Sequence, residues 1–431
     1  MKKLYISLMC LILSVPCHSQ DLIIKHINII SMTSPKVMKK KSVLMKNGLI
    51  VKIVPFRKLK KISGVKIIDG KGKYLMPGLA DMHVHLPEKE EVDQLLEMSL
   101  AAGITTLRVM NNSTYSQTDL LTDLANDEKR IVPNLHCSYL VKRDLKKASV
   151  PYFDSLINDM KSSGLEFIKL YSLANEEVYD ELMTSAKKNN MIVCGHYPYY
   201  KKNEKWQSVG IEKVLQSGLR SIEHVGGYTA IRDEKKLQDA IRLTKKQGVY
   251  NCPTIDWAVM AFDIQYPEAV KNRLTYRTLP QKITSSWEQE YAIYIKKAGG
   301  EKKIIENRAK RLPTYEKKKK VLKLLYKNDC LLLVGSDGER AYQAPGFNLW
   351  EEMKNWSDLG IDNYTILKSA TINAASFFKQ ADTWGTIEEG KQADLIILDK
   401  NPLVDIENIS TIESTIAHGR LFDCRTILEK K

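Results

Sequence analysis

Short apolar runs and longer amphipathic segments alternate along the chain, and their spacing divides it into three parts. From 21 to 76 the apolar runs follow one another closely, and Asn47-Gly48 between two of them indicates a β-hairpin. From 77 to 382 short apolar runs alternate with segments of helical periodicity. From 383 onward the sequence is again rich in β-branched residues and turn residues. The pattern therefore predicts two β-rich flanks around a central region of strand–helix units.

The central region contains eight apolar runs that we expect to be parallel strands. They lie at about 76–86, 103–110, 132–141, 166–171, 191–196, 221–224, 249–254 and 330–337. Strands that alternate with helices form a parallel sheet, and eight such units can close into a barrel. The segment from about 256 to 320 delays the eighth strand and has a helical pattern. We interpret it as an insertion that lies as a lid over a site.

The predicted fold is α/β, a (β/α)8 TIM barrel with a small β-sandwich domain built from both termini. The barrel is expected over 77–382, and the sandwich from 20–76 plus 383–431. A chain of 431 residues that is 43% hydrophobic is long enough to bury a large core and a smaller satellite.

The first residues have the pattern of a secretory signal peptide. Two lysines precede an uncharged apolar run from Leu4 to Val15, and a small residue, Ser19, offers a cleavage point. We expect a signal peptide over 1–19 and an exported protein, periplasmic or extracellular, with no integral membrane span once the signal is removed. An uncleaved membrane anchor and lipid attachment at Cys17 are the alternatives.

The chain has a formal net charge of +15, which raises the question of an anionic partner. Its lysines are scattered in short clusters, such as 39–41, 58–61 and 317–320, without interleaved aromatic residues. This favours a solvated surface and speaks against nucleic acid as a partner. The predicted partner is a small-molecule substrate, and a homo-oligomer is compatible with the sequence.

Candidate metal ligands begin with His83 and His85, separated by one valine at the end of the first barrel strand. Alternate residues of a strand point to the same side, so the two imidazoles can hold one divalent ion. The other strand ends carry further ligand types, since Lys169 lies in the fourth strand, His196 and His224 end the fifth and sixth, and Asp337 ends the eighth. A barrel gathers its strand ends on one face, so the six side chains are expected to meet there.

These residues carry a family resemblance. Over almost the whole mature length the chain resembles the amidohydrolase superfamily, specifically its imidazolonepropionase-like and prolidase-like branch. The matching motifs, in order, are Pro77-Gly78 with His83-x-His85, the strand at 167–171, Gly195-His196, Ile222-Glu223-His224, Gly335-Ser336-Asp337, and 385–399 with Asn401-Pro402-Leu403.

The resemblance implies a site for two divalent metal ions, with zinc the expected metal. His83, His85 and Asp337 would hold the more buried ion, and His196 with His224 the more exposed one. Lys169 would bridge them after carbon dioxide has converted its amine into a carbamate. Two metals lower the pKa of a water between them and polarise a carbonyl, and Asp337 would serve as the catalytic proton carrier.

The expected reaction is hydrolysis of amide or peptide bonds in dipeptides or N-acyl amino acids. A lactone or phosphotriester hydrolase would use the same site, and a catalytically inactive ligand-binding barrel is a further alternative. Three residues near strand ends are predicted to contact the substrate, namely His136, Tyr228 and Arg340. Many relatives carry a histidine in the loop after Asp337 that this chain lacks, which leaves the substrate open.

Overall fold

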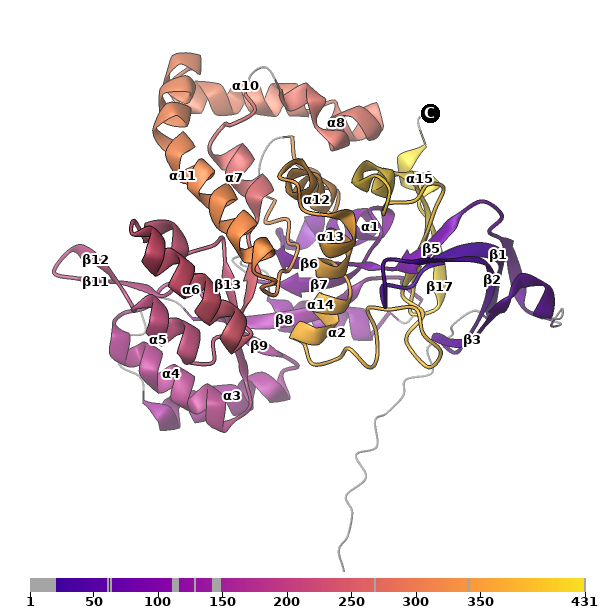
Figure 1. Ribbon diagram of the computed structural model, residues 1–431, viewed down its shortest axis with the longest axis horizontal. Coiled ribbons are helices and arrows are strands. Elements are labelled where there is room, and N and C mark those ends of the chain that lie inside the picture. Colours follow the sequence, from indigo (N-terminus) through magenta and orange to yellow (C-terminus); the bar gives the residue numbers. More distant parts are fainter. Residues whose placement is uncertain are drawn as a thin grey trace, which may run out of the picture.

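A computed structural model of the protein describes residues 21–59, 62, 64–110, 116–127, 129–141, 149–266, 269–338 and 342–429. Figure 1 shows a barrel region in the middle and left of the molecule and a β-sheet region on the right, where the beginning and the end of the described chain lie side by side. The predicted signal peptide at 1–19 falls outside the described residues. No helix in the described ranges is long and apolar enough to cross a bilayer.

The two ends of the chain form one eight-stranded sheet. Its order is β17-β16-β15-β5-β1-β2-β3, with β4 beside β1. The predicted joining of the two flanks is confirmed, and the strands that the sequence places in a sandwich are hydrogen-bonded into this continuous sheet. The strands are β1 (Leu22–Ile30), β2 (Val37–Lys46), β3 (Leu49–Pro55), β4 (Lys66–Asp69), β5 (Tyr74–Pro77), β15 (Leu395–Leu398), β16 (Ile412–Ala417) and β17 (Arg420–Asp423).

The joint between the two ends is β5, which runs parallel to β1 and antiparallel to β15. Alternate residues of these strands point to the same face of the sheet, and one of the two faces buries a core of its own. Leu75 of β5, Ile29 of β1 and Ile397 of β15 are all fully buried in that core. Because β5 leads directly into the barrel, the sheet and the barrel are fixed to each other at this point.

The barrel contains seven assigned parallel strands in the order β14-β13-β10-β9-β8-β7-β6. They are β6 (Leu79–Val84), β7 (Ile104–Val109), β8 (Asn134–Val141), β9 (Phe167–Leu170), β10 (Ile192–Gly195), β13 (Ser221–Glu223) and β14 (Tyr250–Cys252).

The predicted eighth strand is present as an extended segment at 331–337 with few ladder bonds. The Leu333 amide donates to Asn251 O of β14 at 2.9 Å, and Leu331 O accepts from the Asn251 amide at 2.9 Å. On its other side, Val334 O accepts from the amide of Met82 in β6 at 3.0 Å. The segment therefore joins the first strand to the seventh, and the predicted (β/α)8 barrel is confirmed.

Helices follow the strands and cover the outside of the barrel. They are α1 (Val92–Ala101), α2 (Gln117–Ala125), α3 (Val150–Ser162), α4 (Glu176–Lys188), α5 (Ile211–Gln216), α6 (Glu234–Gln247), α12 (Asn348–Asp358), α13 (Asn363–Ser369) and α14 (Ile372–Phe377), with α15 (Arg425–Leu428) at the C-terminal end. A short hairpin, β11 (Tyr199–Lys202) with β12 (Lys205–Ser208), lies between β10 and α5 and was not predicted.

Helix α6 illustrates how the sequence fixes these helices. The Asp233 side chain accepts a hydrogen bond from the amide of Lys236 at the N-terminus. Gly248 ends the helix in the left-handed conformation with φ of 64°. The face with Leu237 and Ile241 is fully buried against the barrel, whereas the lysines lie outside.

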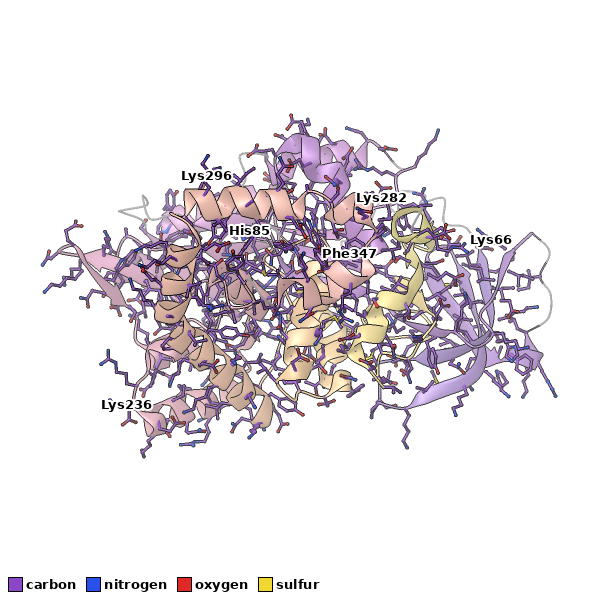
Figure 2. The ribbon with its side chains drawn as sticks, turned by 90° about the horizontal axis from the view of Figure 1, so that it is seen from above. Lys66, His85, Lys236, Lys282, Lys296 and Phe347 are labelled. Carbon is purple, nitrogen blue, oxygen red and sulfur yellow. The ribbon has the colours of Figure 1, made fainter. Side chains whose placement is uncertain are left out.

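The segment between β14 and the eighth strand position is helical throughout its assigned elements. It contains α7 (Ile255–Ala261), α8 (Leu274–Thr278), α9 (Gln281–Thr284), α10 (Trp287–Lys297) and α11 (Glu301–Lys327). Figure 1 shows α8 and α10 at the top of the molecule, with α7 and α11 descending from them to the barrel. In Figure 2, seen from above, Lys282 and Lys296 lie on this insertion, and Lys66 lies at the other end on the terminal sheet.

A buried ion pair lies at the start of the insertion, and a hydrogen bond from its acidic residue links it to α12 of the barrel. Both guanidinium amines of Arg273 donate to the Asp256 carboxylate, at 3.0 and 2.9 Å, and both side chains are fully buried. The amide of Asp256 in turn donates to Glu352 of α12 at 2.6 Å. Paired and hydrogen-bonded charges of this kind hold one geometry, so the insertion is anchored at its start.

Candidate metal centre

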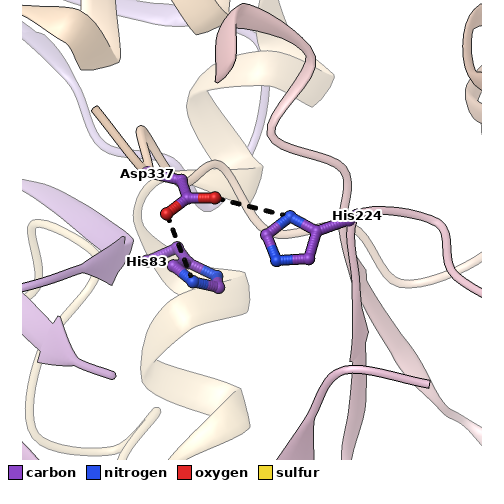
Figure 3. A group of neighbouring side chains, drawn as sticks. All are labelled: His83, His224 and Asp337. Atoms are coloured by element: carbon purple, nitrogen blue, oxygen red, sulfur yellow. Dashed lines mark ion pairs between the residues drawn. The ribbon is translucent and has the colours of Figure 1, made fainter. Parts of the chain in front are cut away.

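The six predicted ligands come together at the carboxyl ends of the barrel strands. His83 lies near the end of β6 and His85 just beyond it, Lys169 lies in β9, and the other three follow β10, β13 and the eighth strand position. The side chain of Asp337 lies between the imidazoles of His83 and His224, as Figure 3 shows. Residues separated by as much as 254 positions thus share one small volume because parallel strands end on the same face.

Two imidazoles approach the same carboxylate oxygen. Asp337 Oδ1 lies 3.2 Å from His85 Nε2 and 3.6 Å from His83 Nε2. The other oxygen, Oδ2, lies 3.6 Å from His224 Nδ1. One carboxylate is therefore shared among three imidazoles, two from the end of β6 and one from the end of β13.

A second pair of imidazoles meets next to this group. His196 Nε2 and His224 Nε2 lie 3.1 Å apart, and the two rings are nearly perpendicular. Lys169 is fully buried, and its Nζ lies 3.3 Å from His83 Nε2. Besides burial, the charge of Lys169 also contributes to lowering the pKa of His196 and of His224, so the lysine lies near both groups of imidazoles.

Unusual backbone conformations aim these side chains. His224 and Asp337 have φ of 60° and 48°, a left-handed conformation that non-glycine residues seldom adopt. Such strain collects where a side chain must be directed against local preference. Gly335 is required for a different reason, since a Cβ there would lie 2.5 Å from Cys252 Sγ and 2.8 Å from His83. The close approach of the eighth strand position to His83 thus depends on a residue without a side chain.

Burial favours the neutral form of three of the imidazoles, His83, His196 and His224. Desolvation lowers the pKa of His83 and of His224 well below the usual value, and it lowers the pKa of His196 to about 3. It also lowers the pKa of Lys169 below that of an exposed lysine. Neutral imidazoles can bind a metal without first losing a proton, and the neutral amine is the form of lysine that reacts with carbon dioxide.

A buried carboxylate orients His83 from behind. Glu223 Oε2 lies 2.9 Å from His83 Nδ1 and accepts a hydrogen bond from Arg108 Nη2 at 2.8 Å. Its other oxygen accepts from Ser221 Oγ at 2.6 Å. All four residues are fully buried. A carboxylate on Nδ1 fixes the tautomer that leaves Nε2 free to bind a metal.

Sequence reasoning gave Arg108 and Glu223 no role at the site. A charged residue inside an apolar run such as 104–109 is the signal that could have found Arg108, because a buried arginine requires a partner.

The insertion also reaches the site, through three residues. Thr254 Oγ1 lies 2.6 Å from His224 Nδ1, and the Trp257 ring lies 5.9 Å from the His224 ring. Lys318 of α11 donates from Nζ to His224 O at 2.7 Å. Burial lowers the pKa of Lys318 to about 8. The prediction of an insertion over the site did not identify these contacts, because they depend on how the helices pack.

Two of the three predicted substrate contacts lie away from the imidazole cluster. His136 is near the beginning of β8, where its Nδ1 lies 2.8 Å from Glu166 Oε2 and its ring stacks on Phe378 at 3.7 Å. Tyr228 is fully buried, and its hydroxyl lies 2.7 Å from Thr244 Oγ1 of α6. In this structure each of these side chains contacts other protein groups, and its contact with a substrate stays a prediction. Arg340 lies outside the described residues.

A cavity of about 370 Å³ borders the cluster beside His85. Its wall includes Asp81, Ser336 and Asn348, and it is open to the surface. Asp81 Oδ1 accepts from the amides of His83, at 3.2 Å, and Ser336, at 2.9 Å, and so ties the first strand to the eighth strand position. There is accordingly room for a small molecule next to the imidazoles.

The donor set fits divalent metal ions. Ligand atoms of His83, His224 and Asp337 all lie within 4.8 Å of one another. Imidazole nitrogens and carboxylate oxygens are preferred ligands of zinc and similar ions. Three such ligands with open space beside them are typical of a catalytic metal site, in which one coordination position is left for water or substrate. The buried carboxylate behind His83 is the outer support that such ligands commonly have.

A parallel barrel with this ligand cluster at its carboxyl end defines a class of metal-dependent hydrolases. Residues 74–422, most of the chain, match the amidohydrolase family, and the protein belongs to that family. The resemblance to amidohydrolases that the sequence indicates is thereby confirmed at the level of the family.

The similarity to individual proteins is lower or covers only part of the chain. The dihydroorotase of Carboxydothermus hydrogenoformans is 36% identical over 97 residues, which are 21% of this chain and 22% of that protein. The chain therefore matches about a fifth of the length of this relative. A solved Xaa-Pro dipeptidase with bound methionine in its active site has a TM-score of 0.68 at 18% identity and covers 94% of this chain and 100% of its own. A molinate hydrolase structure has a TM-score of 0.68 at 14% identity, with 95% and 96% covered. At these identities the structures establish the fold.

Proposed function

We propose that the protein is a binuclear amidohydrolase that cleaves amide or peptide bonds in dipeptides or N-acyl amino acids. The observation that carries the proposal is the shared position of Asp337, which contacts His83 and His85 through one oxygen and faces His224 through the other. His83, His85 and Asp337 would hold one ion, and His196 and His224 the second.

Lys169 is the proposed bridge between the two ions, as a carbamate. A fully buried, unmodified lysine beside imidazoles would repel a metal ion once protonated, whereas a carbamate is an anion with two oxygen donors. The lowered pKa of Lys169 favours the neutral amine that this modification requires. When bound, two divalent ions, with zinc the expected metal, supply an activated water near neutral pH and polarise the carbonyl of the scissile bond.

Asp337 is the proposed catalytic residue. Its carboxylate lies at the centre of the cluster and is almost fully buried, so it can take a proton from the attacking water and return it to the nitrogen of the leaving amine. The second transfer matters because an amine leaves far more readily once it is protonated.

The substrate class has two sources of support. The family acts on carbon–nitrogen bonds, and one structure of the same fold is a Xaa-Pro dipeptidase. A lactone or phosphotriester hydrolase would use the same residues and is the alternative to be tested. We further propose that the protein is exported, on the signal-peptide pattern of residues 1–19.

Metal analysis combined with a substrate screen tests the proposal. We expect near two metal ions per chain and turnover of dipeptides or N-acyl amino acids, with lactones and phosphotriesters as comparison substrates. Asp337→Asn should lower kcat by about 100- to 10,000-fold, because the amide cannot accept the proton. Asparagine tolerates the left-handed backbone at this position, so the fold should survive.

Asp329→Asn is the matched control, since Asp329 also has a positive φ, of 52°, but pairs with Lys245 at the surface. It should keep full activity. Turnover by Asp337→Asn at the level of the unchanged protein would refute the assigned role.

A further inference from the structure

Lys318 is a buried cation at the edge of the candidate metal centre. It lies on α11 of the insertion and is 7% exposed. Its Nζ donates to His224 O at 2.7 Å, the backbone carbonyl of one of the proposed ligands. Besides burial, the charge of the same lysine contributes to lowering the pKa of His196 and His224. A side chain from the insertion thus brings a positive charge to the rim of the cluster.

Within the described part of the chain, Lys318 makes no ion pair. The acidic side chains that face it are Asp337 and Glu352, and both are engaged elsewhere. Asp337 faces the imidazoles, and Glu352 accepts from Trp356 Nε1 at 2.7 Å and from the Asp256 amide at 2.6 Å. The contrast with Arg273 of the same insertion is clear, since that cation has a bidentate carboxylate partner.

A buried charge is costly unless an opposite charge compensates it. The His224 carbonyl satisfies one of the three donors of the ammonium group, which leaves two for another acceptor. The remaining partner should be an anion that enters the site, and an ammonium without a carboxylate partner, close to a catalytic cluster, is suited to receive one.

We propose that Lys318 binds the carboxylate of the substrate, and that the enzyme therefore selects amide substrates that carry a free carboxylate near the scissile bond. This inference rests on the proposed function, because it concerns the substrate of the same site. It assigns a role to the insertion, which supplies a specificity residue in addition to covering the barrel. Neutral amides would leave the ammonium uncompensated and bind less well.

A purely structural role makes a different prediction. If Lys318 only held His224 in place, its loss would affect every substrate equally and would lower metal binding. If it binds substrate carboxylate, its loss affects only substrates that have one. The two roles are separated by substrates that differ in this group alone.

The experiment uses the metal-loaded full chain with N-acyl amino acids and dipeptides, each paired with its C-terminal amide. Lys318→Met should lower kcat/KM for the carboxylate substrates by about 10- to 100-fold, as expected for loss of a charged hydrogen bond. The amide-capped substrates should change less than threefold, and metal content should not change. Lys318→Arg should recover part of the loss. Lys323→Met, an exposed lysine on the same helix, is the control and should behave as the unchanged protein.

Binding measured by calorimetry separates failure of this inference from failure of the proposed function. The probes are N-acetyl amino acids and their C-terminal amides. If nothing is hydrolysed but Lys318→Met still weakens binding of the carboxylate probe alone, the inference stands and the reaction assignment falls. If Lys318→Met lowers the affinity for the carboxylate probe and for its amide equally, or changes neither affinity, the inference is overturned while the hydrolase assignment remains.

Discussion

His83 Nδ1 and Glu223 Oε2 lie 2.9 Å apart in the fully buried wall of the barrel, and Arg108 donates to the same carboxylate oxygen. One side of the His83 ring is therefore fixed by protein, and the other faces the candidate metal site. The arrangement makes metal affinity depend on two residues that would not touch the metal.

Removal of the carboxylate charge should weaken metal binding. Glu223→Gln keeps the size of the side chain but no longer favours one tautomer of His83, so we expect metal affinity to fall about 10- to 100-fold. Competition with a chelator of known affinity measures this effect. Affinity equal to that of the unchanged protein would show that Glu223 does not orient His83.

Removal of the arginine should act on stability. Arg108→Met leaves the Glu223 carboxylate buried without its cation, and loss of one partner of a buried pair costs about 3–5 kcal/mol. Chemical denaturation of the metal-free protein measures this loss in the free energy of unfolding. Arg130→Met is the control, because its partner Asp93 is largely exposed. Equal stabilities of the two variants would contradict the expected cost.

Lys169→Ala should reduce bound metal from two ions per chain to one or fewer and abolish turnover. The reason is that the proposed carbamate is lost with the amine. Added short carboxylic acids should restore part of the activity by occupying the space left by the side chain. Exposed Lys187→Ala is the control. Full activity of Lys169→Ala without added acid would rule out the bridging role.

Gly335→Ala should disturb the site although alanine is apolar and small. The added Cβ would meet Cys252 Sγ at 2.5 Å and His83 at 2.8 Å, so the eighth strand position or His83 must shift. We expect a loss of about 1–3 kcal/mol in stability together with lower metal occupancy. Gly210→Ala provides the comparison, since no atom lies within 4 Å of the added Cβ and φ is −59°. Unchanged metal occupancy in Gly335→Ala would show that the site tolerates the shift.

The stability of the anchored insertion should depend on pH through Glu352. Burial raises the pKa of this carboxyl from 4.5 to about 8. Between these values the folded chain holds a proton that the unfolded chain has released, so stability falls as pH rises, by at most about 1.4 kcal/mol per pH unit. Glu352→Gln should remove this slope, as measured by urea unfolding at pH 5.5 and 7.5. The exposed Asp358→Asn variant should retain it, and the same slope in Glu352→Gln would contradict the assignment.

The local sequence pattern was sufficient for the order of the barrel strands and for the residues at their ends. The eighth strand position was predicted from its apolar run, although the structure gives it only a few ladder bonds. The β11–β12 hairpin was missed because β12 and the second half of β11 are exposed, and because its turn at Asn203 and Glu204 adopts positive φ without a glycine. The contacts of His136 with Glu166 and of Tyr228 with Thr244 were not predicted, because sequence position does not show which way a side chain points.

The sequence by itself determined the barrel, the joining of the two termini and the set of candidate ligands, since apolar periodicity and residue type are local properties. Tertiary structure alone decided which residues support those ligands and which buried cation lies beside them. Arg108 contacts Glu223 across 115 residues of sequence, and Lys318 contacts His224 across 94. Contacts between residues so far apart cannot be predicted from local sequence periodicity. These contacts matter because the residues are buried. Water stabilises a charge at the surface, whereas a charge inside the protein requires a protein partner.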